Sequence, residues 1–303
     1  MSAQNSVLVV GSIALDDVET PFGKRENAIG GAAIFFGIAA SYFTHIRIVG
    51  VAGEDFPEAT LEMLKSRNID TSGIEIADGK TFRWGGKYHE DINCRDTLYT
   101  HLNVFADFKP KIPKSFENTP YIFLGNIQPQ LQLDVLKQIK NPKFIALDTM
   151  NLWIHTTRED LLKVIQKVDL VLINDSELRE LTDELNLLKG LDKLHQMGPK
   201  IAVIKKGEHG AYLSYARQLF YCPVYPVYQP TDPTGAGDSF AGGFMGYLAA
   251  SNRIDFRTLK KATIYGAIMG SFLVEHFSVD GLLNLKKEDI DQRYKAIRAM
   301  AML

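Results

Sequence analysis

Short apolar runs alternate with helix-like stretches along most of this chain, and that order limits the folds it can form. Runs rich in Val, Ile and Leu occupy residues 7–11, 46–53, 121–125, 143–148, 169–174 and 201–207. Between most of them, apolar residues recur at helical spacing, over 57–68, 131–139, 158–168 and 191–197. Uninterrupted apolar runs are typical of parallel strands covered on both faces. The alternation therefore predicts an α/β fold with a doubly wound, mainly parallel sheet flanked by helices.

Two regions break this alternation, residues 12–29 and 80–104. The first is polar and the second alternates aromatic with polar residues, a pattern typical of strands exposed on one face. Because open α/β sheets bind ligands at the carboxyl ends of their strands, these insertions predict a small β lid over a site. A surface sheet without a role in binding is the alternative. No linker or repeat interrupts the sequence, so we expect a single domain over 1–303 that carries this lid.

The composition limits the binding partners and the cellular environment that we expect for this chain. The formal net charge is −2, which does not favour nucleic acid or an anionic membrane as the main partner. Cys94 and Cys222 lie far apart and outside the spacing of a zinc motif. The chain lacks 18 uninterrupted apolar residues, and no basic region precedes its first apolar run, so neither a membrane helix nor a signal peptide is predicted. We therefore expect a soluble, cytoplasmic protein.

The segment "DPTGAGDSF", residues 232–240, combines two carboxylates with a bare turn that leads into an apolar, helix-like stretch. A helix that starts at this turn would present free backbone N–H groups and the positive end of its dipole, which suit a phosphate. Gly235, Ala236 and Gly237 let a ligand approach the backbone closely. Asp238 beside such a ligand predicts a base or a cation holder. A helix start with an aspartate cap is the alternative.

Polar groups also follow two neighbouring strand-like runs. Asn174 and Glu177 come after the run at 169–174 and together could organise a hydrated Mg²⁺, although the same pair is a good helix cap. Lys205 and Gly207 end the run at 201–207, where the lysine could meet a phosphate or simply lie on a hairpin turn. These two segments and the 232–240 segment all carry groups that are compatible with a phosphate or a metal ion. Together they favour a phosphate site at this edge of the sheet.

At this point the sequence resembles the PfkB/ribokinase family of small-molecule kinases. The segment "DPTGAGDSFAGGF" is similar to the C-terminal signature of that family, and "GGAAIFFGIAASYF" (30–43) to the glycine-initiated helix of its N-terminal signature. The opening "VLVVGSIALDD", the segment "VGVAGEDFPEATLEMLKSRNIDTSGI" and "NDSE" resemble further family motifs in the family's order. The resemblance spans almost the whole chain and implies a ribokinase-like fold.

The resemblance also implies roles for residues around the phosphate site. Asp238 would be the base that activates an acceptor hydroxyl, and the N–H groups of residues 235–237 would form the anion hole during transfer of the γ-phosphoryl group of ATP. Asn174 and Glu177 would organise Mg²⁺ through water. Asp232 and Thr234 match positions that hold a monovalent cation, usually K⁺, in several members.

On the acceptor side, the resemblance implies that Asp16 binds hydroxyls of the acceptor and that Gly30 and Gly31 let the acceptor lie close to the backbone. The adenine would lie among residues around 207–230 and 262–280. The chain departs from the sugar-kinase pattern at Ala14 and Phe35, where that pattern has Asn. Replacement donors are expected among Asn126, Asn151, Arg83 and Trp84, each of which also has a purely structural explanation.

The sequence thus predicts an enzyme that phosphorylates an alcohol with MgATP. We expect a carbohydrate or polyol acceptor first and a nucleoside second. A kinase-fold binding protein without turnover stays open as an alternative. A dinucleotide-dependent oxidoreductase is disfavoured because no GxGxxG follows the first strand. The exposed aromatic face expected of the lid is compatible with closure within one chain and with a homodimer through the lid.

Overall fold

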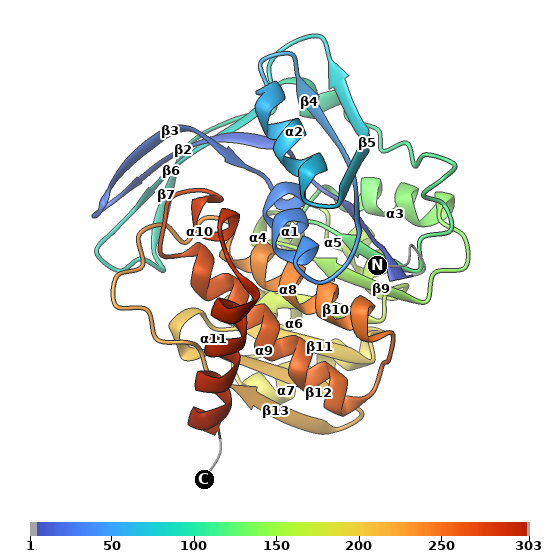
Figure 1. Ribbon diagram of the computed structural model, residues 1–303. Helices are drawn as coiled ribbons and strands as arrows, with labels where there is room; N and C mark the ends of the chain where they lie inside the picture. Colours follow the sequence, from blue (N-terminus) through green and yellow to red (C-terminus); the bar gives the residue numbers. More distant parts are fainter. Residues whose placement is uncertain (1–4, 302–303) are drawn as a thin grey trace.

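The main sheet is built from strands that follow the predicted alternation. A computed structural model describes residues 5–301, and within them this sheet has nine strands. They are β1 (Val7–Val10), β4 (Ile46–Gly53), β5 (Ile69–Ala77), β8 (Tyr121–Leu124), β9 (Phe144–Asp148), β10 (Leu170–Asn174), β11 (Ile201–Lys205), β12 (Ala211–Tyr215) and β13 (Gln218–Cys222). Their order is β13-β12-β11-β10-β9-β8-β1-β4-β5 (Figure 1). All pairs from β5 to β11 are parallel, and the last two pairs are antiparallel.

Helices cover both faces of this sheet. One face packs against α1 (Ala32–Ser41), α2 (Glu58–Ser66), α8 (Ala236–Ser251), α9 (Phe256–Leu273), α10 (Asp280–Leu283) and α11 (Lys287–Ala301). The other packs against α3 (Pro129–Gln138), α4 (Asn151–Thr156), α5 (Arg158–Ile165), α6 (Asp175–Thr182) and α7 (Leu187–Gln196). Successive residues of one strand enter opposite cores: Val7 and Val9 lie in the first, Leu8 and Val10 in the second. Burial on both faces explains why these strands are apolar throughout.

A second sheet of four strands forms the lid. It contains β2 (Ala14–Thr20), β3 (Gly23–Gly30), β6 (Phe82–Tyr88) and β7 (Arg95–His101), in the order β3-β2-β6-β7. Strand β2 pairs parallel with β6, and the other two pairs are antiparallel. Figure 1 shows this sheet extending away from the main body beside α10. The strands expected within 12–29 and 80–104 are therefore confirmed, and β3 ends one residue beyond the first range.

Several boundaries differ from the predicted ones for local reasons. Helix α3 begins at Pro129 and not at 131, because proline fits the first helical position, where no N–H bond is needed. Helix α7 begins at Leu187 and not at 191, because the Asn186 side chain accepts hydrogen bonds from the backbone N–H groups of Leu188 and Lys189. Strands β5 and β13 are absent from the prediction because each is an edge strand with exposed residues, and β12, which pairs with β13, is absent too.

Close approach of helices positions α8 at the centre of one layer. A Cβ on Gly242 would lie 2.5 Å from the carbonyl oxygen of Phe36 in α1, and one on Gly243 would lie 2.6 Å from that of Tyr265 in α9. Only glycine allows these backbones to come so near. Helix α8 is therefore held between α1 and α9, with its first residues at the carboxyl edge of the sheet.

The lid also exposes apolar side chains. Leu98 on β7 and the neighbouring Leu102 are 57% and 48% exposed. Pairing of the lid with a second copy of the chain stays a prediction. Among the helices of residues 5–301, none is both long enough and apolar enough to cross a lipid bilayer.

We predict that Phe123→Ala destabilises the fold by about 3–5 kcal/mol, the usual cost of truncating a buried aromatic residue. Phe123 is fully buried on β8 and stacks on Phe36 of α1, with ring centroids 4.2 Å apart. The measurement is urea unfolding followed by circular dichroism. The exposed Leu98→Ala is the control and should change stability by no more than about 0.5 kcal/mol. Equal effects of the two substitutions would contradict this packing.

Candidate active site

The turn at 232–238 leads directly into α8. Gly235 caps the helix with φ of 79°, a left-handed conformation that glycine adopts without strain. A Cβ there would lie 2.4 Å from the ring of Phe35, so the aromatic ring of α1 packs against the turn. The N–H of Ala236 donates to the carbonyl oxygen of Pro233 at 3.0 Å. Gly237 is the second residue of α8. Its N–H therefore belongs to the first turn, where backbone N–H groups have no acceptor within the helix.

Asp238 is the third residue of α8 and is partly buried. Burial raises its pKa to about 7, with a further contribution from the charge of Asp148, while Lys205 and Arg95 act in the opposite direction. A carboxyl group with a pKa near neutrality can exchange a proton with a ligand at physiological pH. The geometry therefore suits Asp238 to proton transfer beside a helix N-terminus.

Asp148 and Lys205 form an ion pair under this turn. The Lys205 Nζ lies 3.3 Å and 3.4 Å from the two carboxylate oxygens of Asp148. Burial alone would lower the pKa of Lys205, but the charges of Asp148, Glu177 and Asp238 outweigh it and raise the pKa. The lysine is therefore a cation at neutral pH. A Cβ on Gly237 would lie 3.0 Å from its Nζ, so the ammonium lies directly against the turn.

Asn174 and Glu177 form a capping box at the start of α6. The Asn174 side chain accepts a hydrogen bond from the backbone N–H of Glu177 at 2.7 Å, and Glu177 accepts one from the backbone N–H of Asn174 at 2.8 Å. Burial raises the pKa of Glu177 to about 7, and Asp148 adds to this effect, while Lys205 opposes it. The helix-cap interpretation is thus correct. The cap uses one carboxylate oxygen of Glu177 and the amide oxygen of Asn174, so the other carboxylate oxygen and the amide N–H₂ group stay available for another partner.

Asp16 is the buried carboxyl group of the lid side. It lies on β2 and is 5% exposed, and a Cβ on Gly30 of β3 would overlap its Oδ2. Gly31 has φ of 96° and lies against the carbonyl oxygen of Ser12. Burial raises the pKa of Asp16 to about 8, helped by the charges of Asp232, Asp17 and Asp238. The structure therefore brings Asp16, Asp232 and Asp238 to one place.

Asp232 is 1% exposed and anchors the turn from behind. One carboxylate oxygen accepts from the backbone N–H of Thr234 at 2.8 Å, and the other from that of Ser278 at 3.0 Å. The Thr234 hydroxyl lies 3.1 Å from the hydroxyl of Tyr88, which is the last residue of β6. The lid is thus hydrogen-bonded to the turn.

The remaining predicted residues have partners of their own. Asn126 accepts a hydrogen bond from the indole Nε1 of Trp153 at 2.8 Å, and Asn151 accepts one from the backbone of Leu152 at the exposed start of α4. Arg83 pairs with Asp55 at 3.1 Å and also donates to Asn27. Trp84 lies over Gly86 within the lid. The structure therefore places Asn126 and Asn151 toward α4 and Arg83 and Trp84 in the lid sheet.

Gly207 belongs to a short 3₁₀ turn after β11, with φ of 53°. A Cβ there would lie 2.9 Å from the amide oxygen of Asn93, and Asn93 also donates to Glu208 at 3.3 Å. The loop between β6 and β7 thus reaches the loop that follows β11.

The sequence interpretation missed three residues of this site. Tyr88 and Arg95 are cross-strand partners in the lid, and Arg95 faces both Tyr88 and Asp238. Asp148 ends β9, and an acidic residue at the carboxyl end of a buried strand was the signal available for it. The predicted residue of this segment, Asn151, begins α4, whereas Asp148 faces Lys205.

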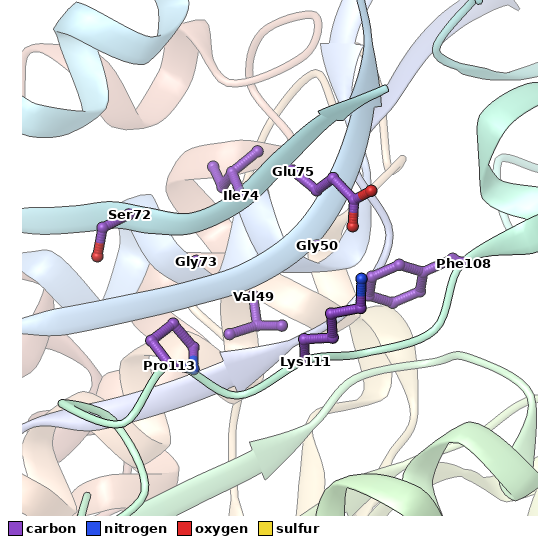
Figure 2. Close-up of a pocket in the computed structure, with 9 residues that line it drawn as sticks. All are labelled: Val49, Gly50, Ser72, Gly73, Ile74, Glu75, Phe108, Lys111 and Pro113. Atoms are coloured by element: carbon purple, nitrogen blue, oxygen red, sulfur yellow. The ribbon is translucent and has the colours of Figure 1, made fainter. Parts of the chain in front are cut away.

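Cavities also lie away from the 232–238 turn. One of about 170 Å³ is lined by β4, β5 and the 108–113 segment, and Figure 2 shows Glu75 and Lys111 pointing toward one another there. Another, of about 470 Å³, is lined by residues of 276–285 around α10. Neither is lined by a residue of the 232–238 turn.

Comparison with known proteins defines the class of protein. The family model for pfkB family carbohydrate kinases matches residues 5–284. The chain therefore belongs to this family and has the ribokinase-like fold. It is an ATP-dependent phosphotransferase with an alcohol group as acceptor.

Similar proteins include kinases of different acceptors. The chain is 31% identical to a cytidine kinase of Thermococcus kodakarensis over 245 residues, covering 79% of this chain and 87% of the relative. The solved nucleoside kinase of Methanocaldococcus jannaschii has a TM-score of 0.77 at 20% identity and covers 96% of this chain and 98% of its own. A Vibrio cholerae fructokinase solved with fructose, ADP and potassium ion has a TM-score of 0.78 at 16% identity, covering 97% of this chain and 99% of its own.

We predict that kcat/KM rises with pH through a midpoint near pH 7 and levels above about pH 8. A base must be deprotonated to accept a proton, and the Asp238 pKa of about 7 sets the midpoint of the rise. The measurement is the kcat/KM profile between about pH 5 and pH 9 with the best acceptor. A profile that is flat across this range would show that Asp238 does not limit turnover.

We predict that Asp16→Asn stabilises the protein at pH 8 and that the gain shrinks toward pH 4. The folded protein holds the Asp16 proton with a pKa of about 8, against an ordinary value of 3.8. The unfolded chain therefore binds fewer protons between these values, and stability falls as pH rises through them. The measurement is Tm at both pH values. A Tm gain that is independent of pH would contradict a titrating Asp16.

Proposed function

We propose that the chain is a MgATP-dependent kinase that phosphorylates a hydroxyl group of a nucleoside. Phe35 carries this proposal: it stands where the sugar-kinase pattern has Asn, it is 2% exposed, and its ring packs against Gly235. Ala14 likewise offers no hydrogen bond. Both changes remove polar contacts suited to a free sugar and leave an apolar floor suited to a base. The similarity to a cytidine kinase supports the same choice, so the nucleoside alternative replaces the carbohydrate or polyol acceptor as the leading hypothesis.

The acceptor would lie between the lid and the start of α8. Asp16 provides a carboxyl group for a ribose hydroxyl. Gly30 lets that carboxyl group pack directly against the backbone of β3, because a Cβ there would lie 2.0 Å from Oδ2 of Asp16, and Gly31 lies against Ser12 in the same way. Asn126 retains its amide donor for the acceptor, since only its oxygen is engaged by Trp153. The lid places Asp17, Asn27, Arg83 and Tyr99 in one hydrogen-bonded cluster next to Asp16. Such polar side chains suit the edge of a heterocyclic base.

Asp238 would accept the proton of the attacking hydroxyl. Its pKa near neutrality allows it to be ionised when the acceptor binds and to hold the proton after transfer. The N–H groups at the start of α8, with Gly235, Ala236 and Gly237 as the anion hole, would stabilise charge on the phosphoryl group. The Ala236 N–H must then exchange its bond to Pro233 for one to the phosphoryl oxygen.

The residues on the nucleotide side fit ATP and Mg²⁺. The bare Cα of Gly237 leaves a space that a Cβ would fill, and the Lys205 ammonium borders it. Lys205 would bind phosphate, with Gly207 in the adjoining loop. Asn174 and Glu177 provide amide and carboxylate oxygens, which Mg²⁺ prefers, and would hold it through water. When bound, Mg²⁺ neutralises part of the charge of the phosphates.

Asp232 and Thr234 would hold K⁺ behind the turn. Each carboxylate oxygen of Asp232 accepts one backbone N–H bond and keeps a lone pair for a cation. Burial raises the pKa of Asp232, and a bound cation would offset that cost.

ADP release with MgATP over a panel of nucleosides, sugars and polyols tests this function. We expect a nucleoside, with cytidine among the first to be tried, to give the highest kcat/KM. Asp238→Asn should lower kcat by about 10²–10⁴, the range that positioned general bases contribute. The exposed Lys287→Gln, on α11, is the control. A sugar preferred over every nucleoside would overturn the acceptor class, and an undiminished Asn variant would overturn the base.

A further inference from the structure

Asp148 is a buried charge without a role in the function proposed so far. It ends β9 and is 6% exposed. Its carboxylate accepts hydrogen bonds from the Lys205 ammonium and from the backbone N–H of Thr149, the latter at 3.0 Å. A carboxylate removed from water is costly unless a cation accompanies it. Asp148 and Lys205 therefore depend on one another.

The sheet brings this pair to the phosphate side of the site. Strands β9 and β11 flank β10, with Leu172 opposite Asp148 and Asn174 opposite Lys205. The backbone of Lys205 therefore lies two residues nearer the carboxyl edge of the sheet than that of Asp148. The lysine side chain crosses the end of β10 to reach the Asp148 carboxylate. The carboxylate determines where the ammonium lies.

That place is the underside of the α8 turn. The Lys205 Nζ occupies the position next to Gly237, 3.0 Å from where a Cβ would be. Its distances of 3.3 Å and 3.4 Å to Asp148 exceed the roughly 2.7–2.9 Å of a tight charge-assisted bond. The ammonium has three protons and is not drawn fully onto the carboxylate, so it retains donors for a ligand at the turn.

We propose that Asp148 is a positioning residue that holds the Lys205 ammonium under the α8 turn, where it meets the β- or γ-phosphate of the nucleotide. This proposal rests on the nucleotide-side assignment of Lys205 above. Asp148 does not touch the nucleotide itself. It keeps a flexible lysine in one orientation, so that less conformational entropy is lost when the phosphates bind.

A purely structural ion pair is the competing explanation, and it makes different demands. A structural ion pair could lie anywhere in the core. Its removal would lower the stability of the fold but would not selectively weaken nucleotide binding. The position of the ammonium against Gly237, at the end of α8, ties the pair to the phosphates.

The test measures binding of Mg²⁺ with adenylyl imidodiphosphate, and separately of AMP, to Asp148→Asn. Displacement of a fluorescent ATP analogue restricts the readout to the nucleotide site. We expect the affinity for the triphosphate analogue to fall about 10- to 100-fold, as for loss of a charge-assisted hydrogen bond, with AMP unchanged. Equal losses for both nucleotides, or unchanged binding of both, would overturn the proposal.

Companion variants separate positioning from folding. Lys205→Met should show the same selective loss, and the double variant should be no worse than Lys205→Met alone, because Asp148 acts through the lysine. Asp148→Glu, which keeps the charge, should recover part of the affinity. Asp169→Asn is the matched control, because Asp169 accepts a hydrogen bond from Ile145 at the opposite end of β10. Additive losses would overturn the proposal.

The outcome is independent of the acceptor. One outcome is that the acceptor panel reveals no acceptor while Asp148→Asn weakens binding of the triphosphate analogue but not of AMP. In that case the proposed kinase function is wrong and the positioning role of Asp148 stands. If Lys205→Met binds both nucleotides as the unmodified chain does, Lys205 is not a phosphate ligand and Asp148 positions nothing for the nucleotide.

Discussion

The contact of α8 with its neighbours is the constraint on which the site depends. Gly242 and Gly243 allow the helix to approach α1 and α9 more closely than any side chain would permit. This approach fixes the first turn of α8 beneath Phe35 and above Lys205. Since the donors of the turn are backbone N–H groups, their direction is set by the helix as a whole. The packing of α8 in the core thus also determines how the N–H groups of its first turn are oriented.

Burial, more than pairing, sets the electrostatics of the site. Asp16, Glu177 and Asp238 all have raised pKa values, and in each case removal from water is the largest cause. Lys205 partly offsets this for Glu177 and Asp238. Carboxyl groups in this state are ready to take up cations or protons. A site that handles MgATP and an alcohol proton requires both abilities.

The sequence alone was sufficient for β1, β4, β8, β9, β10 and β11, because an unbroken apolar run has few other solutions. It was insufficient for β5, whose polar residues lie at an exposed edge, and for the starts of α3 and α7, which Pro129 and Asn186 determine locally. The same limit applies to the site. The "TGAGD" turn is local and was recognisable, but the meeting of Asp148 with Lys205 crosses an intervening strand.

The acceptor class shows a further limit of this kind. Ala14 and Phe35 indicated what the pocket lacks, and an absence of donors cannot rank sugars against nucleosides. The ring of Phe35 against Gly235 and the polar cluster of Asp17, Arg83 and Tyr99 exist only in three dimensions. The linear order of residues does not display these contacts, on which the proposed acceptor class depends.

The hairpin between β6 and β7 connects the two sides of the site. At the end of β6 the Tyr88 hydroxyl meets Thr234 beside the turn, and in the connecting loop Asn93 meets Gly207 and Glu208 in the loop after β11. One hairpin therefore contacts both the turn before α8 and the loop after β11. Because the same hairpin holds both contacts, a ligand that shifts it at one loop would also alter the contact at the other loop, so ligands bound at the two loops would be thermodynamically linked without touching one another.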